Sequence, residues 1–275
     1  MNLTDIKCKL RYFFNKKSEG RLPIDLSEYK LKYCDTFQEK EVFKKMWHIG
    51  QFWGNYHPKY LNQHYSENRI NIGPSIKDFK ENNLVLETAL EPKKITIETG
   101  DVNMPYGVGL IVSENSFGYG YYEIEAKLPE GSALWPAIWL SARDSWPPEI
   151  DIMEGYTDNK RNYEYKSLFF KNWQLQSNFH YGESVKNHSS LGPKNHPLPI
   201  SVTDNFIKYS CLLESDCIKI YYNNYLVREI TDENILKWYR NTPMRIVLNN
   251  AVQKDFKAEN FSQMIVRSVK FYSKD

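Results

Sequence analysis

The stretch FGYGYYEIEAKLPEGSALWPAIWLSARDSWPPEIDIME, residues 117–154, contains three strand patterns in succession. Polar and apolar residues alternate in YYEIEAKL (121–128), which gives one apolar face and one charged face. ALWPAIWL (133–140) is a continuous apolar run, as expected for a buried strand, and EIDIME (149–154) alternates again. Gly, Pro and Ser residues separate the three patterns. The stretch therefore predicts three β-strands joined by turns.

The rest of the chain shows the same character from about Leu31 onward. One short helix is expected, near Asp232–Tyr239. Many strands, few helices and no repeat of about 20–50 residues predict an all-β fold, an antiparallel β-sandwich of two sheets. The other expected strands are LVLETAL (84–90), ITIETG (95–100), LQSNFHYG (175–182), FIKYSCLL (206–213), IKIYYN (218–223), MRIVLNNAV (244–252) and MIVRSVKFYS (264–273).

Composition narrows the classes of protein that the chain represents. Apolar residues make up 41% of the 275 residues and charged residues 25%, which is typical of a globular protein. The aromatic share of 15% favours a β-rich fold, a surface that stacks on flat ligands, or both. The net charge of +2 is too small for a protein that binds nucleic acid by neutralising phosphates. No apolar run approaches the ~20 residues of a membrane-spanning helix. We expect neither a nucleic-acid partner nor a membrane span.

The beginning of the chain differs from the rest. Residues 1–21 hold six basic and two acidic side chains. Apolar residues at helical spacing predict a short helix over 3–15, and Gly, Pro and charged residues predict a linker over 15–23. We therefore expect a basic, partly helical extension over residues 1–30 and one β-domain over 31–275. The extension is either a solvated arm or a contact for anionic lipid or a partner.

Histidine and cysteine give no signal for a metal site. Residues 183–205 predict a long polar loop, and its His188 and His196 have no Asp, Glu or Cys cluster beside them. They are therefore expected in solvent. Cys211 and Cys217 either face each other across a tight turn or are two free thiols. No zinc-binding spacing and no Cys-x-x-Cys occurs among Cys8, Cys34, Cys211 and Cys217. We expect no metal and no cofactor.

The pattern EIDIME carries three carboxyl groups. Side chains at i and i+2 of a strand share a face, so Glu149 and Asp151 point together while the two isoleucines point into the core. Glu154 comes one position late and joins that face only if a β-bulge inserts one residue. Clustered carboxylates repel, so at least one holds a proton at neutral pH, and such a pair is what glycoside hydrolysis uses. Spacing alone favours a plainer interpretation, an exposed acidic face on an edge strand.

Tryptophans around these acids reverse that preference. Trp135 and Trp139 share a face of the apolar run, and Trp146 lies beside two prolines, where no strand buries it. Indole faces stack on sugar rings through the C–H bonds of the sugar, so sugar-binding clefts are aromatic. We expect Trp135 and Trp146 nearest the bond that is cut, and Trp139 deeper or at the edge of the cleft.

Together these residues resemble glycoside hydrolase family 16, the group of laminarinases, agarases, carrageenases and lichenases. The motif Glu-x-Asp-x-x-Glu is intact at Glu149, Asp151 and Glu154. Its form with two residues before the last Glu resembles the laminarinase-like and galactanase branches. Residues 32–47, 243–252 and 264–273 resemble the family's first, late and closing strands, so the resemblance covers roughly residues 31–275. It implies a concanavalin-like jelly roll with a substrate groove on its concave sheet.

The resemblance also implies roles for single residues. Glu149 corresponds to the nucleophile, Asp151 to an assisting acid and Glu154 to the general acid/base. His180, in FHYG, resembles the family's histidine on the neighbouring strand, and Asn249 lies where the family often has a polar residue near the cleft. A structural calcium ion is implied by the resemblance only, and we expect a monomer. The expected substrate-binding residues are Trp135, Trp139, Trp146, His180 and Asn249.

The sequence thus predicts a retaining endo-β-glycanase that hydrolyses internal β-glycosidic bonds of a polysaccharide. The carboxyl groups of Glu149 and Glu154 are expected about 5–5.5 Å apart, the separation of a retaining enzyme. One alternative is a transglycosylase, and another is a catalytically silent lectin on the same fold, which has no need of both glutamates. The sequence does not choose among four substrates: β-1,3-glucan, mixed-linkage glucan, agar-like galactan and a bacterial capsule. The family is mostly exported, yet residues 1–21 lack the features of a secretory signal.

Overall fold

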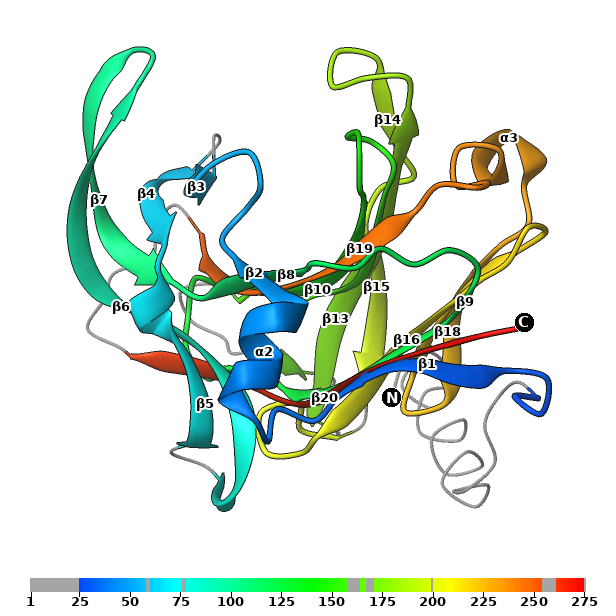
Figure 1. The fold of residues 1–275 in the computed structure, drawn as a ribbon, viewed down its shortest axis with the longest axis horizontal. Helices are drawn as coiled ribbons and strands as arrows, with labels where there is room; N and C mark the ends of the chain where they lie inside the picture. The colour runs from blue at the N-terminus through cyan, green and yellow to red at the C-terminus, as the bar shows by residue number, and fades with distance from the viewer. Residues whose placement is uncertain are drawn as a thin grey trace.

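The computed structural model describes residues 25–57, 60–75, 78–157, 164–166, 171–198, 200–253 and 261–274. Most of this part of the chain is β-strand, arranged in two sheets around a common core (Figure 1). The all-β sandwich predicted from the sequence is confirmed. The helix expected over 3–15 and the linker expected over 15–23 lie outside the described residues.

The larger sheet supplies one layer of the sandwich. Its described strands pair antiparallel, except β4 and β7, which are parallel. In spatial order they are β18 (Tyr225–Ile230), β17 (Ile218–Tyr222), β16 (Ile207–Leu213), β9 (Gly120–Lys127), β20 (Ser262–Ser273), β6 (Asp78–Ile97), β7 (Gly100–Val108), β4 (Tyr60–Tyr65) and β3 (Tyr56–His57), with β1 (Lys30–Asp35) beside β20 and β5 (Ile70–Ser75) beside β6.

The smaller sheet supplies the other layer, and all pairs of its described strands are antiparallel. In spatial order they are β12 (Glu164–Lys166), β13 (Lys171–Gly182), β11 (Glu149–Glu154), β10 (Leu134–Ala142), β19 (Met244–Val252), β8 (Leu110–Ser113) and β2 (Trp47–Ile49), with β14 (His188–Ser190) and β15 (Lys194–Leu198) beside β13.

Helices are few in the described part of the chain. They are α2 (Lys40–Met46), the 3-10 turn η1 (Glu67–Arg69) and α3 (Glu233–Leu236). The short helix expected near Asp232–Tyr239 is confirmed as α3, and the Asp232 side chain caps it by accepting from the backbone N–H of Asn234. The α-helices, of seven and four residues, are far too short to cross a membrane.

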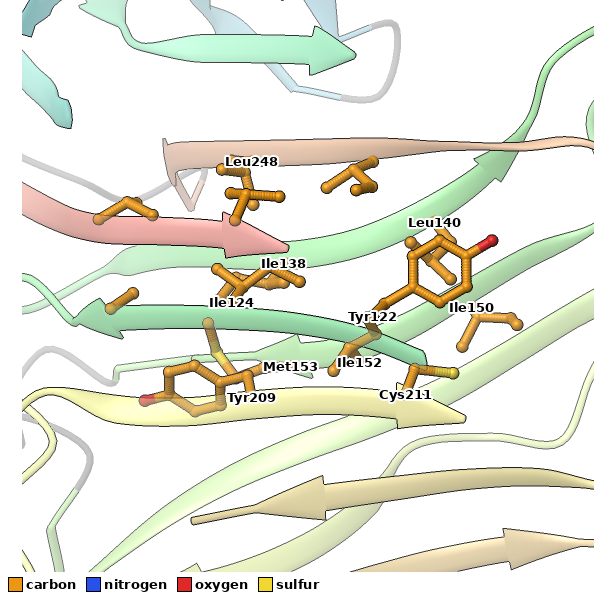
Figure 2. Packing of buried hydrophobic residues seen from close by; sticks show 14 of the residues in the cluster. Tyr122, Ile124, Ile138, Leu140, Ile150, Ile152, Met153, Tyr209, Cys211 and Leu248 are labelled. Atoms are coloured by element: carbon orange, nitrogen blue, oxygen red, sulfur yellow. The ribbon is translucent and has the colours of Figure 1, made fainter. Parts of the chain in front are cut away.

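The core lies between the sheets and fixes which side of the smaller sheet faces outward. Side chains of β9 and β16 meet those of β10, β11 and β19 there (Figure 2). Each fully buried aliphatic side chain contributes about 1.5–3 kcal/mol, so a one-residue slip of register is strongly disfavoured. The residues labelled in Figure 2 are all fully buried: Tyr122, Ile124, Ile138, Leu140, Ile150, Ile152, Met153, Tyr209, Cys211 and Leu248.

A buried polar contact joins β1 of the larger sheet to β2 of the smaller one. Asp35 ends β1, and its Oδ2 accepts from the indole Nε1 of Trp47 at 2.8 Å. Its Oδ1 accepts from the backbone N–H of Phe37 at 2.7 Å, and Phe37 has a positive φ of 57°. All three residues are buried, so the carboxylate is satisfied without water and holds the chain as it crosses between the sheets.

Four features of the local structure were predicted wrongly or missed. Residues 84–90 and 95–100 belong largely to one 20-residue strand, β6, rather than to two strands. Pro92 has no N–H for the ladder, and a bulge between Leu90 and Lys93 lets β6 continue past it. The polar segment 183–205 is not one loop, because its β14 and β15 pair with β13. Helix α2 was not expected at all.

The fourth error concerns His196, which is buried rather than in solvent. Its Nε2 lies 2.8 Å from the Ser177 hydroxyl, and burial together with Lys194 and Arg228 lowers its pKa to about 3. His196 is therefore a neutral core residue. His188 is exposed, as expected. Of the two thiol alternatives, the structure shows Cys211 and Cys217 free.

Candidate active site

A groove of about 1190 Å³ crosses the face of the smaller sheet that points away from the core. One wall comes from the turn after β2, with Phe52 and Trp53, and from Tyr65 of β4. The opposite wall comes from β13 and β14, including His188. Figure 1 shows β3, β4 and β7 on one side of β19 and β14 on the other. The groove is thus built mainly from strands, which hold side chains in fixed places.

Strand alternation explains which side chains form the floor. Trp135 and Trp139 of β10 and Asn249 of β19 point into the groove, while Ile138 and Leu140 point into the core. The Nε1 of Trp139 donates to Asn249 Oδ1 at 2.8 Å, which fixes the orientation of both side chains. Trp139 also packs against a small cluster that includes Val247, so it lies in the floor of the groove.

A β-bulge in β11 brings three acids to this floor. Along β11, Asp151 pairs with Asn178 and Glu154 with Gln176, so three steps on β11 oppose two on β13. The register with β10 shifts at the same place, between Ile138 and Trp139. The extra residue is absorbed on the core side, where Ile152 and Met153 are both fully buried. The bulge expected from the sequence is confirmed, and all three acids line the groove.

Glu149 is held by donors and aromatic rings at one end of the acid row. The indole Nε1 of Trp146 donates to Glu149 Oε2 at 2.9 Å. The Tyr239 hydroxyl contacts the backbone oxygens of Glu149 and His180 at 3.2 and 2.9 Å, which ties β11 to β13. The Trp146 ring lies against His188 and His180, with centroids 4.9 and 5.8 Å apart. One oxygen of Glu149 is therefore anchored by Trp146.

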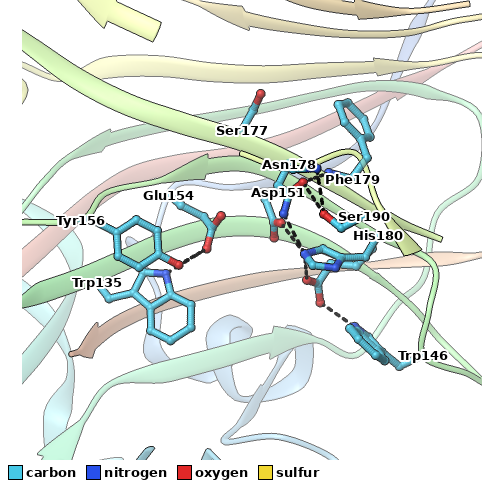
Figure 3. Close-up of polar contacts among 12 residues, drawn as sticks. Trp135, Trp146, Asp151, Glu154, Tyr156, Ser177, Asn178, Phe179, His180 and Ser190 are labelled. Atoms are coloured by element: carbon cyan, nitrogen blue, oxygen red, sulfur yellow. Dashed lines mark hydrogen bonds and ion pairs between the residues drawn. The ribbon is translucent and has the colours of Figure 1, made fainter. Parts of the chain in front are cut away.

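His180 lies close to both Glu149 and Asp151 and is oriented by Asn178; Figure 3 shows it beside Asp151 and Asn178. Its Nε2 lies 3.7 Å from Glu149 Oε1 and 3.4 Å from Asp151 Oδ2. The backbone N–H of Phe179 donates to Asn178 Oδ1 at 2.9 Å, so the Asn178 Nδ2 is the atom 3.0 Å from His180 Nε2. Because Nδ2 only donates, His180 Nε2 accepts. The ring nitrogen that faces Glu149 and Asp151 is therefore held in place by Asn178.

Burial raises the pKa of both Glu149 and Asp151 well above the usual values of 4.5 and 3.8. After burial, the charge of Asp151 raises the pKa of Glu149 most, and the charge of Glu154 does the same for Asp151. His180 in its protonated form opposes the pKa rise of Glu149 most, followed by the Trp146 hydrogen bond. A hydrogen bond with Glu149 opposes the pKa rise of Asp151 most, followed by the charge of Arg228. The two neighbouring carboxyl groups therefore retain a shared proton to higher pH than either would in water.

Glu154 is held at the other end of the row by two donors on the same oxygen. The Trp135 Nε1 and the Tyr156 hydroxyl donate to Glu154 Oε1 at 2.9 and 2.7 Å (Figure 3). The rings of Trp135 and Tyr156 stack, with centroids 5.2 Å apart at 27°. Both bonds fall on Oε1, which leaves Oε2 as the oxygen to serve a reacting group.

The structure brings all the predicted site residues to one groove. Sequence reasoning missed Tyr156, although it follows Glu154 by two positions and is aromatic. It also missed Asn178, whose polar side chain alternates with the buried Ser177 and Phe179 on β13. Finally, it did not assign residues 48–65 to the groove, although their many aromatic residues could have indicated a sugar-binding wall. The predicted residues that line the groove are Trp135, Trp139, Trp146, Glu149, Asp151, Glu154, His180 and Asn249.

One cluster among the described residues has the spacing to hold a metal ion. Glu149, Asp151 and His180 each offer one ligand atom, all within 4.8 Å of one another. Calcium takes about six to eight oxygen ligands, so two carboxylates and an imidazole do not fit the calcium ion that the resemblance implies. The hydrogen bonds of Trp146 and Asn178 account for this cluster without an ion.

Comparison with known proteins decides the family. The sequence model of "Glycosyl hydrolases family 16" matches residues 68–267. The chain belongs to this family. Within family 16, the Endo-1,3-1,4-beta-glycanase ExsH of Rhizobium meliloti (strain 1021) is 30% identical over 146 residues, which are 49% of this chain and 31% of that protein. The Glucan endo-1,3-beta-glucosidase A1 of Niallia circulans is 26% identical over 213 residues, 70% of this chain and 28% of that protein.

This family 16 chain therefore spans 31% or less of the length of those two curated relatives. A solved structure, the laminarinase catalytic domain from Thermotoga maritima MSB8, shares 21% sequence identity with a TM-score of 0.67. The alignment covers 90% of this chain and 98% of that one, so the two share the whole sandwich. The family and the fold predicted from the sequence are both confirmed.

Proposed function

We propose that the chain is a retaining endo-β-glycanase that works by double displacement, with Glu149 as nucleophile and Glu154 as general acid/base. The observation that carries the proposal is the bulge in β11, which places Glu149, Asp151 and Glu154 on one groove face. Membership of family 16 and relatives named as endo-glycanases support the same reaction. The scheme uses carboxyl groups alone and needs no cofactor.

In the first step, Glu149 attacks the anomeric carbon while Glu154 protonates the leaving oxygen. The proton shared by Glu149 and Asp151 moves to Asp151, which leaves Glu149 ionised. A bond forms between a Glu149 oxygen and the anomeric carbon as the bond to the glycosidic oxygen breaks. Glu154 gives its proton from Oε2, because Oε1 already accepts from Trp135 and Tyr156. The charge left on Glu154 is then stabilised by those two donors.

In the second step, Glu154 acts as a base. Its carboxylate takes a proton from water, and the water oxygen forms a bond with the anomeric carbon as the ester to Glu149 breaks. Asp151 returns its proton to the shared position. The anomeric configuration is inverted twice and is therefore retained. This route depends on the expected separation of about 5–5.5 Å between the carboxyl groups of Glu149 and Glu154.

The groove also guides the choice of substrate. It crosses the strands and is open on the side away from the sheet, which suits an internal stretch of a long glycan. The reported relatives are named for β-1,3- and β-1,3-1,4-linkages, so we propose a β-1,3-glucan-like polysaccharide first and a galactan or capsule glycan second. We propose that the enzyme is a monomer.

Product analysis and variant rescue test the proposal. Proton NMR of the first sugar released from a β-linked polysaccharide panel should show the β-anomer, since a retaining enzyme forms it first. Glu149→Ala should be inactive and should regain turnover with azide by forming an α-glycosyl azide. Glu154→Ala with azide should instead give the β-glycosyl azide. An α-anomer as the first product, or full activity of either variant, would refute the assignment.

The same panel separates the two alternatives. A transglycosylase gives longer products when acceptor sugar is in excess, because a sugar hydroxyl replaces water in the second step. A lectin binds the glycan and releases no reducing ends. The two anchored glutamates and the shared proton favour hydrolytic chemistry over binding alone, because a binding site gains nothing from burying repelling acids.

A further inference from the structure

The groove contains a second set of polar side chains, beside the three acids, in which three atoms have no hydrogen-bond partner. Gln51 and Ser141 line the groove and are 5% and 4% exposed. The Oε1 of Gln51, the Oγ of Ser141 and the Nε of Arg245 are all buried without a hydrogen-bond partner. Buried polar atoms are normally paired, so three unpaired atoms in one groove indicate a place for a ligand.

Arg245 is held in a fixed position at this cluster. Its guanidinium lies over the Phe52 ring, 3.8 Å from the ring centroid, and the His48 ring stacks on Phe52 at 4.2 Å. A cation on an aromatic face is stabilised without using its N–H groups. The N–H groups of Arg245 are thus oriented in advance and remain available for a ligand.

The charge of Arg245 is not neutralised by an ion pair within the described residues. Asp144 lies close enough for the charge of Arg245 to contribute to its lowered pKa. However, both Asp144 oxygens are taken by the Arg143 guanidinium, at 2.8 and 2.7 Å, and Asp144 is 68% exposed. The charges of Arg143 and Asp144 therefore neutralise each other. Among the described residues at this end of the groove, Arg245 keeps a positive charge without an ion-pair partner.

The cluster lies beside the catalytic acids rather than on them. Ser141 of β10 pairs with Glu149 on one side and with Arg245 on the other. Two strand spacings put the backbone of Arg245 about 10 Å from that of Glu149. A sugar bound there is next to the one that reacts. Trp53, which is 59% exposed at the rim, offers an aromatic face at the same end.

We propose that Gln51, Ser141 and Arg245 form a subsite for a sugar that carries an oxoanion, a sulfate ester or a carboxylate. The inference rests on the proposed function and adds the class of substrate, an acidic β-glycan. A guanidinium matches the paired oxygens of such a group with two parallel N–H donors. The Ser141 hydroxyl donates a third bond, and the Gln51 amide binds a neighbouring hydroxyl.

Binding by an inactive protein tests the subsite apart from catalysis. Glu149→Gln protein is titrated at low salt with β-1,3-glucan oligosaccharides of one length, in unmodified, sulfated and carboxymethylated forms. The same three forms of a β-galactan oligosaccharide make a second backbone. We expect an acidic form to bind about tenfold or more tightly than its neutral partner. Comparison of the sulfated and carboxymethylated arms identifies which oxoanion the subsite takes.

Variants assign any preference to Arg245. Adding Arg245→Gln to the Glu149→Gln protein should remove the preference for the acidic form and leave binding of the neutral form within about threefold. Arg240→Gln is the matched control, because it removes the same charge from an exposed ion pair with Glu233 outside the groove. It should leave the preference unchanged. Arg245→Lys keeps the charge without the paired donors and should retain part of the preference, which controls for misfolding of the glutamine variant.

Two results would overturn the proposal. One is that acidic forms bind no better than neutral forms on either backbone. The other is an equal loss for acidic and neutral forms on Arg245→Gln, which would make the cluster a site for neutral hydroxyls. Hydrolysis of the neutral forms by the protein with Glu149 intact is measured in parallel. Hydrolysis of the acidic forms is measured as well. Failure to cleave any form, neutral or acidic, refutes the proposed function, whereas the binding preference alone decides the subsite.

Discussion

The two faces of strand β11 differ in what they contribute to the protein. On one face Ile150, Ile152 and Met153 are fully buried against the larger sheet. On the other face three acids stand in a row along the groove, and the two whose pKa values shift are both raised. The same six residues thus stabilise the fold on one side and oppose it on the other.

This difference separates stability from reactivity within a single strand. Burial of apolar surface is favourable, whereas burial of neighbouring carboxyl groups costs free energy unless a proton is retained. Packing of the apolar face holds the strand rigidly. It therefore keeps the acids close together although their mutual repulsion is unfavourable. Variants on the two faces should therefore move activity and stability independently.

The largest expected effect is on the acid face. Glu149→Gln should reduce hydrolysis below detection, and Glu154→Gln should reduce kcat by about 10²–10⁴-fold, because each removes a group that forms or breaks a bond. Neither should lower the melting temperature, since an amide removes a buried acid without leaving a cavity. Initial rates and thermal unfolding measure the two quantities. Strong destabilisation of Glu149→Gln would contradict the idea that the acid face affects activity and the core face stability.

The next effect is on the core face. Ile152→Ala should lower the free energy of unfolding by about 2–5 kcal/mol, because it leaves a cavity between the sheets. Its kcat below the melting transition should stay close to that of the wild type. Urea unfolding and single-temperature kinetics are the measurements, and Ile152→Val is the milder control, expected to cost about 0.5–1.5 kcal/mol. Loss of kcat in the folded variant would show that the core face tunes the acids directly.

The pH dependence of stability should also distinguish the faces. The raised pKa of Glu149 means that the folded protein binds a proton more tightly than the unfolded chain does. Its stability contribution is present at low pH and is lost as the pH rises from the usual 4.5 through the raised pKa. Glu149→Gln should therefore gain melting temperature relative to the wild type as the pH rises, whereas Ile152→Ala should show a constant difference. A constant difference for Glu149→Gln would contradict the raised pKa.

The smallest expected effect concerns the tryptophans beside the acid face. Trp146→Ala should weaken oligosaccharide binding about tenfold, or ~1.4 kcal/mol, with little change in melting temperature. Trp139 packs against Val247 and its neighbours in the floor, so Trp139→Ala should lower the melting temperature as well. Calorimetric titration and thermal unfolding compare the two variants. If Trp146→Ala unfolds the protein and leaves affinity unchanged, Trp146 belongs to the core.

The sequence predicts this strand well because both of its faces leave local patterns. Alternation places Glu149 and Asp151 together, and the late position of Glu154 requires the bulge that the register shows. Trp135 and Trp146 were expected near the acids, and each donates to one of the two glutamates. Those contacts come from the adjoining strand and from the turn just before β11.

Features that depend on distant parts of the chain were not predictable in the same way. His196 is buried because β15 pairs with β13 and because Ser177 meets its ring, and neither fact leaves a pattern around His196. Arg245 becomes notable only when the turn after β2 lays Phe52 across it. Polar strands such as β14 lack apolar alternation, so their composition resembles that of a loop.

The bulge in β11 also changes what a deletion would do. In an ordinary strand, loss of one residue exchanges the two faces for everything that follows. Here Ile152 and Met153 both point into the core, so removal of Met153 would turn Glu-Ile-Asp-Ile-Met-Glu into a regular alternation with all three acids still on one face. The cost would be an unfilled volume in the core rather than a lost acid. This short segment can therefore lose one residue during evolution and still keep its three acids on the groove face.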